Sequence, residues 1–323
     1  MRRLYLIVHL SLFVTICSAQ SFSVDSVVTP ASLKELVQTL AADSFQGRLA
    51  GTKEAVKAAY FIADEFKKAG ALPVAGNDGY FMSFYTRAGA IANVIAALPG
   101  HDKAKELVIF SAHYDHLGTE SSTPYHTTQR DSKEKDEIYN GANDNASGTS
   151  ALIDLARYYA KQRNERTLIF IAFSGEEEGL LGSNKIAFSF DPKVVAAMIN
   201  MDMIGRPISP DKKYPYITGD DQSNLRSILN KQLFKKAPQY GKAWFHEDRF
   251  TDDHLFARSD NYPFALRGIA AHTIMTSSPN DMYYHSLHDE WDKLDYDFLA
   301  KVVKAIALAC SGLTEGTDTA EKY

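Results

Sequence analysis

The chain has 323 residues, of which 45% are hydrophobic and 23% are charged. These values are typical of a globular protein with a sizeable core. The formal net charge is -5 at pH 7, and the sequence carries no dense basic stripe. We therefore do not expect the protein to bind nucleic acid.

The first 19 residues have the composition of a secretory signal peptide. Two arginines precede the mainly apolar stretch 4–16, and small residues end at Ala19. This stretch is too short to span a membrane. We therefore expect cleavage after Ala19, export to the periplasm or the medium, and no stable membrane insertion afterwards. An alternative is a lipoprotein anchored through Cys17, which the large Ile16 in front of it disfavours.

Helix and strand patterns alternate along the rest of the chain. Gly70 is expected to end the second helix, and Ser147 is expected to cap the third. The alternation predicts a three-layer α/β/α fold with a mixed, mostly parallel central sheet, and the polar stretch 119–140 is expected to be a surface loop. Helical periodicity extends over residues 31–41, 53–69, 146–161, 222–236 and 298–313, and strand-like runs over 91–98, 107–111, 168–173, 195–200 and 269–274.

After removal of the first 19 residues, Cys310 is the one cysteine of the sequence. No intramolecular disulfide can form, so we expect the exported chain to be stabilised by its core, with a bound metal as a further candidate. Cys310 falls on the apolar face of the helix predicted over 298–313. We expect it to be a buried hydrophobic side chain and not a reactive thiol.

Acidic and histidine side chains follow the predicted strands. The carboxyl ends of parallel strands meet at one edge of a sheet, so these side chains should converge there. Imidazoles and carboxylates without a thiolate suit zinc, and a bridging carboxylate would let two ions share one site. The residues concerned are His113, Asp115, Asp144, Glu176, Glu177, Asp202 and His285.

Each of these motifs alone also has a purely structural explanation. A single histidine after a strand is usually structural, and an aspartate before a helix is usually an N-cap. The glutamate triplet 176–178 alone would suit a solvated helix start. Their joint occurrence at successive strand ends is what favours metal binding.

Together the motifs resemble those of the co-catalytic di-zinc aminopeptidases, a family related to the glutamate carboxypeptidases and the glutaminyl cyclases. The resemblance extends over nearly the whole mature chain and implies that residues 20–323 form one zinc-peptidase catalytic domain. It rests on His113-x-Asp115, Asn-Asp-Asn-Ala-Ser-Gly at 143–148, Glu176-Glu177 with Gly-Leu-Leu-Gly-Ser at 179–183, Asn-Met-Asp-Met at 200–203, and Tyr284-His285.

The resemblance implies two zinc ions bridged by Asp144. One ion would be completed by His113 and Asp202, and the other by Glu177 and His285. The implied activity is hydrolysis of N-terminal residues from peptides, so peptides are the expected substrates. Nothing in the sequence indicates an oligomeric state.

Three further residues receive roles from the resemblance. Glu176 would be the general base that takes a proton from the metal-bound water. Asp115 would orient the imidazole of His113, and Tyr284 would donate a hydrogen bond to the oxyanion. Glu178 receives no role and is expected to be a solvated helix-start residue.

Three alternatives remain open from the sequence. A one-zinc glutaminyl cyclase would carry an insertion between the acidic pair and the Gly-Ser element, and none is present here. A non-catalytic binding module would have lost metal ligands. A carboxypeptidase would need a basic residue for a C-terminal carboxylate, for which the candidates are Arg206, Arg249, Arg258 and Arg267.

Two departures from the family pattern bear on specificity. The separation of His113 and Asp144 is lengthened by the polar loop 119–140, which would alter the rim of the pocket. Asn261 stands where a histidine is expected after Ser-Asp. If that position contacts substrate, the preference of the enzyme would change.

Overall fold

The structure is a computed structural model that describes residues 22–87, 89–123 and 136–323. The predicted signal peptide and the centre of the polar loop lie outside these residues. Within the described part of the chain, no helix combines the length and the apolar character needed to cross a membrane.

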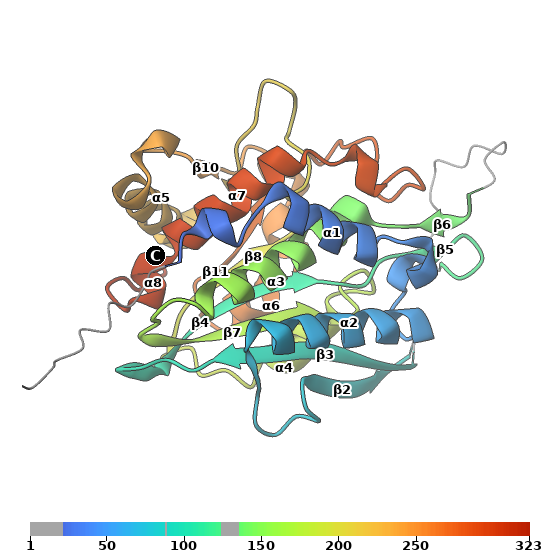
Figure 1. Cartoon of the computed structure of the whole chain (residues 1–323), viewed down its shortest axis with the longest axis horizontal. Helices are drawn as coiled ribbons and strands as arrows, with labels where there is room; N and C mark the ends of the chain where they lie inside the picture. Colours follow the sequence, from blue (N-terminus) through green and yellow to red (C-terminus); the bar gives the residue numbers. More distant parts are fainter. Residues whose placement is uncertain (1–21, 88, 124–135) are drawn as a thin grey trace, which may run out of the picture.

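A nine-stranded sheet forms the centre of the structure (Figure 1). Its order is β1-β3-β7-β4-β8-β11-β9-β10, with β2 paired to β3. Strands β7, β4, β8 and β11 are parallel, and β3 and β9 flank them antiparallel. The strands are β1 (Leu72–Pro73), β2 (Phe81–Thr86), β3 (Gly89–Leu98), β4 (Lys103–His113), β7 (Arg166–Phe173), β8 (Val195–Met201), β9 (Tyr216–Ile217), β10 (His246–Glu247) and β11 (Ala271–Met275).

Helices cover both faces of this sheet, which gives the predicted three-layer α/β/α architecture with a mixed, mostly parallel sheet. One face carries α1 (Pro30–Leu40), α2 (Lys53–Ala69), α3 (Gly148–Tyr159), α5 (Leu225–Lys236) and α7 (Tyr296–Ala309). The other face carries the short helices α4 (Leu181–Ala187) and α6 (Asn261–Leu266).

Successive side chains of the central strands point to opposite faces of the sheet, so the core has two parts, one on each face. In β4, Phe110 packs with the larger set of helices, whereas its neighbour Ile109 packs with α4 and α6. In β7, Phe170 and Ile171 divide in the same way. Strands buried on both faces are continuously apolar, which is why the strand-like runs were visible in the sequence.

The predicted elements are present, with some shifted ends. Gly70 ends α2 in the left-handed conformation, at φ 88°, as expected. Ser147 does not cap α3 through its side chain, because its hydroxyl donates to the carbonyl of Asn143. The last predicted helix is divided at Cys310 into α7 and α8 (Ser311–Thr314), and Cys310 is fully buried, as expected.

One prediction about local structure is wrong, and another concerns a segment that is only partly described. Glu178 is not a helix-start residue, because it lies in the turn that follows β7 and α4 begins only at Leu181. The polar loop starts and ends in a small ladder between β5 (Gly118–Thr119) and β6 (Ile138–Tyr139). Residues 124–135 of this loop lie outside the described residues.

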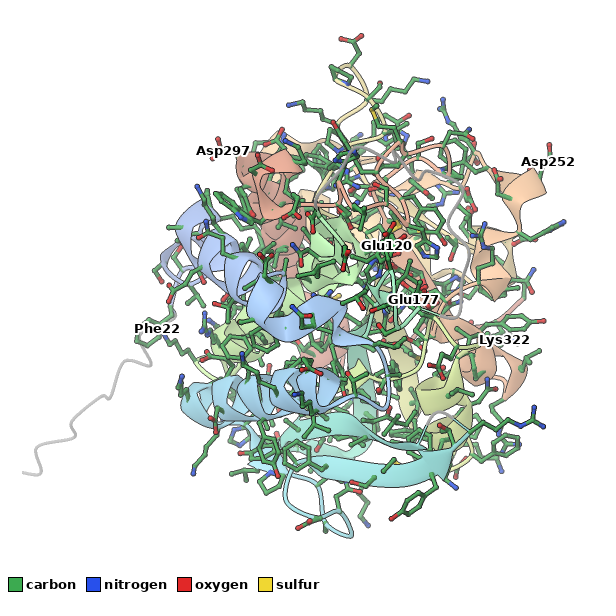
Figure 2. The ribbon with its side chains drawn as sticks, turned by 90° about the vertical axis from the view of Figure 1, so that its right-hand side faces the viewer. Phe22, Glu120, Glu177, Asp252, Asp297 and Lys322 are labelled. Carbon is green, nitrogen blue, oxygen red and sulfur yellow. The ribbon has the colours of Figure 1, made fainter. Side chains whose placement is uncertain are left out.

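The parallel strands all direct their carboxyl ends to one edge of the sheet. Figure 2 looks onto this end of the molecule, and Glu177, just past the end of β7, lies near the centre of the view. In open α/β sheets this edge is the place where ligands bind. The loops after β4, β7, β8 and β11 therefore determine what the site contains.

Candidate active site

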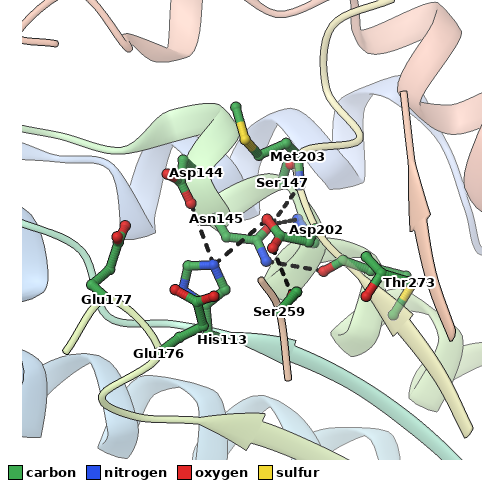
Figure 3. A network of polar contacts seen from close by, with 12 residues as sticks. His113, Asp144, Asn145, Ser147, Glu176, Glu177, Asp202, Met203, Ser259 and Thr273 are labelled. Atoms are coloured by element: carbon green, nitrogen blue, oxygen red, sulfur yellow. Dashed lines mark hydrogen bonds and ion pairs between the residues drawn. The ribbon is translucent and has the colours of Figure 1, made fainter. Parts of the chain in front are cut away.

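A first cluster forms around His113 at the end of β4 (Figure 3). Its Nε2 lies 3.3 Å from Asp144 Oδ1 and 3.6 Å from Asp202 Oδ1. His113 Nδ1 is 3.2 Å from the main-chain oxygen of Asp115. Donation of the Nδ1 proton to that oxygen leaves Nε2 as a bare nitrogen, which is the form that binds a metal.

A second cluster forms on the other side of Asp144. His285 Nε2 lies 3.2 Å from Asp144 Oδ2 and 3.1 Å from Glu177 Oε2. Glu177 comes from the turn after β7, and His285 comes from the loop between β11 and α7. The two clusters share Asp144, whose two oxygens face different histidines.

The turn after β7 places the glutamates in the site. Gly175 adopts φ 78°, a conformation that favours glycine, and the carbonyl of Glu176 accepts hydrogen bonds from the amides of Gly179 and Leu180. The amide of Glu176 donates to Asp115 Oδ1 at 3.3 Å. This tight turn brings Glu176 and Glu177 to the same pocket as His113 and Asp202.

The side chains of both clusters and the distances between them suit divalent metal ions. Asp202 Oδ1 and His285 Nε2 are buried and have no hydrogen-bond partner among the described residues. Ligands at about 2.0–2.1 Å from a tetrahedral zinc ion lie about 3.3–3.5 Å apart, and the spacings of 3.1–3.6 Å here are close to that. Two overlapping groups of candidate ligands contain His113, Asp144 and Glu177, and His113, Glu176 and Asp202.

The electrostatics of the site oppose burial of so many carboxylates without cations. Burial alone would raise the pKa of Asp144, but the neighbouring imidazoles of His113 and His285 hold it well below its usual value. Burial raises the pKa of Glu176 well above its usual value, against the attraction of His113 and with repulsion from Glu177. Burial likewise raises the pKa of Asp115 to about 6.

The structure brings every predicted site residue to this edge, with two differences of detail. The carboxylate of Asp115 is 3.8 Å from His113 Nδ1, so the main-chain oxygen of the same residue is the closer acceptor. Tyr284 stacks on His285, with ring centroids 3.9 Å apart. Tyr284 lines the pocket, and its hydroxyl accepts a hydrogen bond from Arg258 at 3.3 Å.

The pocket also has an apolar wall, formed by Met203, Leu255, Met275 and Pro279. Arg258 lines the same pocket. Of the other candidate arginines, Arg206 is taken up by ion pairs with Asp281 and Asp289 at 2.7 Å, Arg267 lies over the ring of Phe188, and Arg249 is exposed and not among the residues that line the pocket.

Asn261 does not line the pocket. Its side chain is fully buried, donates to the carbonyl of Phe256 at 3.1 Å and accepts from the Thr273 hydroxyl at 2.7 Å. The residue therefore joins α6 to β11. The expectation that Asn261 alters specificity through substrate contact is not supported by this placement.

Three supporting residues received no definite role from the sequence. His116 is buried against Glu177, at 2.8 Å. Asp289 is buried and accepts hydrogen bonds from the amides of Asn143 and Asp144. The guanidinium of the buried Arg48 donates to four main-chain carbonyls around the site, those of Leu40, Tyr114, Asn140 and Gly141.

Only weak sequence signals pointed to these residues. His116 follows His113 by three positions and precedes the apolar Leu117, and Asp289 follows His285 by four. Their partners are distant in the sequence, so no local pattern identifies them.

Comparison with known protein families agrees with this geometry. The model of Peptidase family M28 matches residues 93–310. A probable leucine aminopeptidase of Trichophyton verrucosum (strain HKI 0517) is 25% identical over 295 residues, or 88% of this chain and 74% of that protein. A probable zinc metalloprotease of Pyrenophora teres f. teres (strain 0-1) is 36% identical over 123 residues, or 38% of this chain and 24% of that protein. The match covers about a quarter of the length of this protein and of two similar zinc metalloproteases.

Solved structures share the fold. Legionella pneumophila LapA aminopeptidase superposes with a TM-score of 0.69 at 18% identity, covering 90% of this chain and 74% of that one. Bacteroides thetaiotaomicron glutaminyl cyclase superposes with a TM-score of 0.63 at 23% identity, covering 87% of this chain and 97% of that one. At these identities the likeness shows the fold alone.

Proposed function

Because the chain belongs to peptidase family M28, we propose that it is a zinc-dependent aminopeptidase that removes the N-terminal residue from peptides. The observation that carries the proposal is the pair of ligand clusters that share Asp144. The mature enzyme would comprise residues 20–323 as one catalytic domain. The signal-like segment 1–19 supports export.

Five side chains would hold the metal. Asp144 would bridge two zinc ions, with His113 and Asp202 on one side and Glu177 and His285 on the other. Zinc bound there would lower the pKa of a coordinated water and polarise the carbonyl of the scissile bond. The second position is also suited to hold the free α-amine of a peptide, which would explain selection of the N-terminal residue.

Glu176 would act as the proton acceptor. It lines the same pocket as His113 and Asp202 but belongs to the turn that also carries Glu177. Its raised pKa, caused first by burial, makes it a stronger proton acceptor than a solvated glutamate. The proton would then pass from Glu176 to the leaving amine.

Tyr284 would stabilise the developing oxyanion. Its hydroxyl accepts a hydrogen bond from Arg258, so its own proton remains available for a carbonyl oxygen in the pocket. The apolar wall of Met203, Leu255 and Met275 favours substrates with an apolar N-terminal side chain.

The residues of the same site also bear on two alternative activities, those of a glutaminyl cyclase and of a carboxypeptidase. A one-zinc glutaminyl cyclase would need one of the two clusters, and both are present in the described residues. A carboxypeptidase is favoured by one observation, the position of Arg258 in the pocket, where it would bind a C-terminal carboxylate. A peptide with an acetylated N-terminus distinguishes a carboxypeptidase from an aminopeptidase, because an aminopeptidase does not cleave it.

The test is hydrolysis of Leu-p-nitroanilide and short peptides by the zinc-loaded protein, with metal analysis of the same sample. Glu176→Gln should lower kcat at least ~100-fold while the metal content is unchanged, since positioned general bases contribute roughly 10²–10⁴. Glu178→Gln is the matched control, because the same change is made in the same turn but outside the pocket. Pyroglutamate formation with about one zinc per chain would refute the proposal, as would cleavage of the peptide with an acetylated N-terminus.

A further inference from the structure

His116 occupies a buried place beside the second cluster. Its side chain is 0% exposed, and its Nδ1 lies 2.8 Å from Glu177 Oε1. The next carboxylate oxygen, Asp144 Oδ2, is 3.8 Å from the same nitrogen. The ring also packs edge-on against His285, with centroids 5.7 Å apart.

The contact with Glu177 fixes which ring nitrogen carries the proton. An ionised carboxylate only accepts hydrogen bonds, so His116 Nδ1 must donate. His116 Nε2 is buried and has no hydrogen-bond partner among the described residues. With the proton on Nδ1, Nε2 is an unpaired acceptor. The opposite tautomer would place a buried donor without a partner and leave two acceptors facing each other, which is more costly.

This hydrogen bond takes up one oxygen of Glu177 and turns the other toward the second cluster. Oε1 is held by His116, whereas Oε2 lies 3.1 Å from His285 Nε2. We propose that His116 is a positioning residue for Glu177: it presents a single oxygen to the second zinc ion and thereby sets the affinity for that ion alone. The inference rests on the two-ion site of the proposed function.

The ring is held in a slot shaped for it. A Cβ on Gly141 would lie 2.5 Å from His116 Cδ2 and Cγ, so only glycine leaves room for the imidazole. Gly141 also adopts φ 57°, which favours glycine. Arg48 fixes this segment by donating to the carbonyls of Asn140 and Gly141 at 2.7 and 2.9 Å. The His116 ring therefore cannot turn away from Glu177 without displacing main chain.

The position of His116 predicts a selective effect on metal binding. Its polar contact is to Glu177, which serves the second cluster, and not to His113 or Asp202, which serve the first. Loss of an outer hydrogen bond to a metal ligand typically lowers metal affinity roughly 10–100-fold. The ion held by His113 and Asp202 should keep its affinity.

The experiment compares His116→Asn with His116→Leu. The Asn amide can donate from nearly the place of Nδ1, whereas Leu has a similar size and no donor. Zinc binding to the metal-stripped full chain is measured with a competing chelator, and His285→Ala identifies which binding step belongs to the second ion. Circular dichroism checks that each variant is folded.

The expected result is that His116→Leu weakens the second step roughly 10–100-fold and leaves the first unchanged, while His116→Asn restores most of the affinity. An unchanged second step in His116→Leu would overturn the inference. Equal weakening of both steps, or no rescue by Asn, would assign His116 a purely structural role. If the wild type binds one ion only, the two-ion proposal itself fails, before any variant is compared.

Discussion

The strongest quantitative prediction concerns Asp289, which supports the main chain that carries Asp144. Asp289 is 0% exposed. Its Oδ2 accepts from the amides of Asn143 and Asp144, each at 3.0 Å, and its Oδ1 accepts from Arg206 at 2.7 Å. A hydrogen bond to a charged group contributes about 1.5–3 kcal/mol, and removing one partner of a buried ion pair costs about 3–5 kcal/mol.

Asp289→Asn should lower the free energy of unfolding of the metal-free protein by about 1.5–3 kcal/mol, because Arg206 keeps Asp281 as a partner and the loss is that of hydrogen bonds to a charged group. The substituted amide carries no charge for Arg206 and can point only one oxygen at the two main-chain donors. Because the main chain at Asp144 is then less firmly held, zinc affinity should also fall, roughly 10–100-fold. Denaturant unfolding of the stripped protein and zinc competition measure the two effects.

Asp281→Asn is the matched control for this prediction. Asp281 also pairs with Arg206, at 2.7 Å, but within the described part of the chain it makes no hydrogen bond to Asn143 or Asp144. The variant keeps an oxygen for the amide of Tyr283, which Asp281 now accepts at 3.0 Å. It should lose stability and retain zinc affinity. Equal zinc affinity in the two variants, or a loss below about 1 kcal/mol in Asp289→Asn, would refute the reasoning.

Two other predictions concern metal binding and pH. Asp144→Ala should release both ions, because both clusters share its carboxylate; metal analysis that finds one tightly held ion would contradict the bridge. Burial raises the pKa of Asp154 to about 6, although the hydrogen bond from the Ser32 hydroxyl and the ion pair with Arg157 both act to lower it. Between pH ~4 and ~6 the folded chain holds a proton that the unfolded chain has lost, so this group makes unfolding easier as the pH rises through that window. Asp154→Asn should remove about 1–3 kcal/mol of this dependence in urea unfolding, and identical pH profiles for the two proteins would contradict the assignment.

The sequence predicted the parts of the fold that depend on local pattern. Strands buried on both faces, such as β4 and β7, are continuous apolar runs. His113 is the last residue of β4, and Glu176 and Glu177 follow shortly after β7 ends at Phe173. The helix α2 was predicted with its observed bounds, since it combines an apolar face with a C-terminal glycine. The alternating order of strands and helices then predicted that the ligands lie together at one edge of the sheet.

The remaining features depend on partners that are distant in the sequence. The hydroxyl of Ser147 was expected to cap α3, but the carbonyl of Asn143 accepts from it and the amide of Ile204 donates to it. The short helices α4 and α6 have too few residues to show a period. The roles of His116 and Asp289 exist only once the loops after β4 and β11 are brought together with the turn after β7.

The way each carboxylate is held supports the proposed division of ligands. Asp202 has Oδ2 bound by the Ser259 hydroxyl at 2.8 Å, which leaves Oδ1 toward His113. Glu177 has Oε1 bound by His116, with Oε2 toward His285. In each of these two residues the protein holds one oxygen and turns the other to a single histidine.

Asp144 differs from both, because each of its oxygens faces the Nε2 of a different histidine. Among the described residues, Asp144 is held by a hydrogen bond that its main-chain amide donates to Asp289, and no hydrogen bond is made to its carboxylate. A carboxylate that is positioned through its backbone keeps both oxygens available for cations. This arrangement suits a bridging ligand, and under the proposed function a bridge at Asp144 would depend on Asp289, while the terminal ligands would depend on Ser259 and His116.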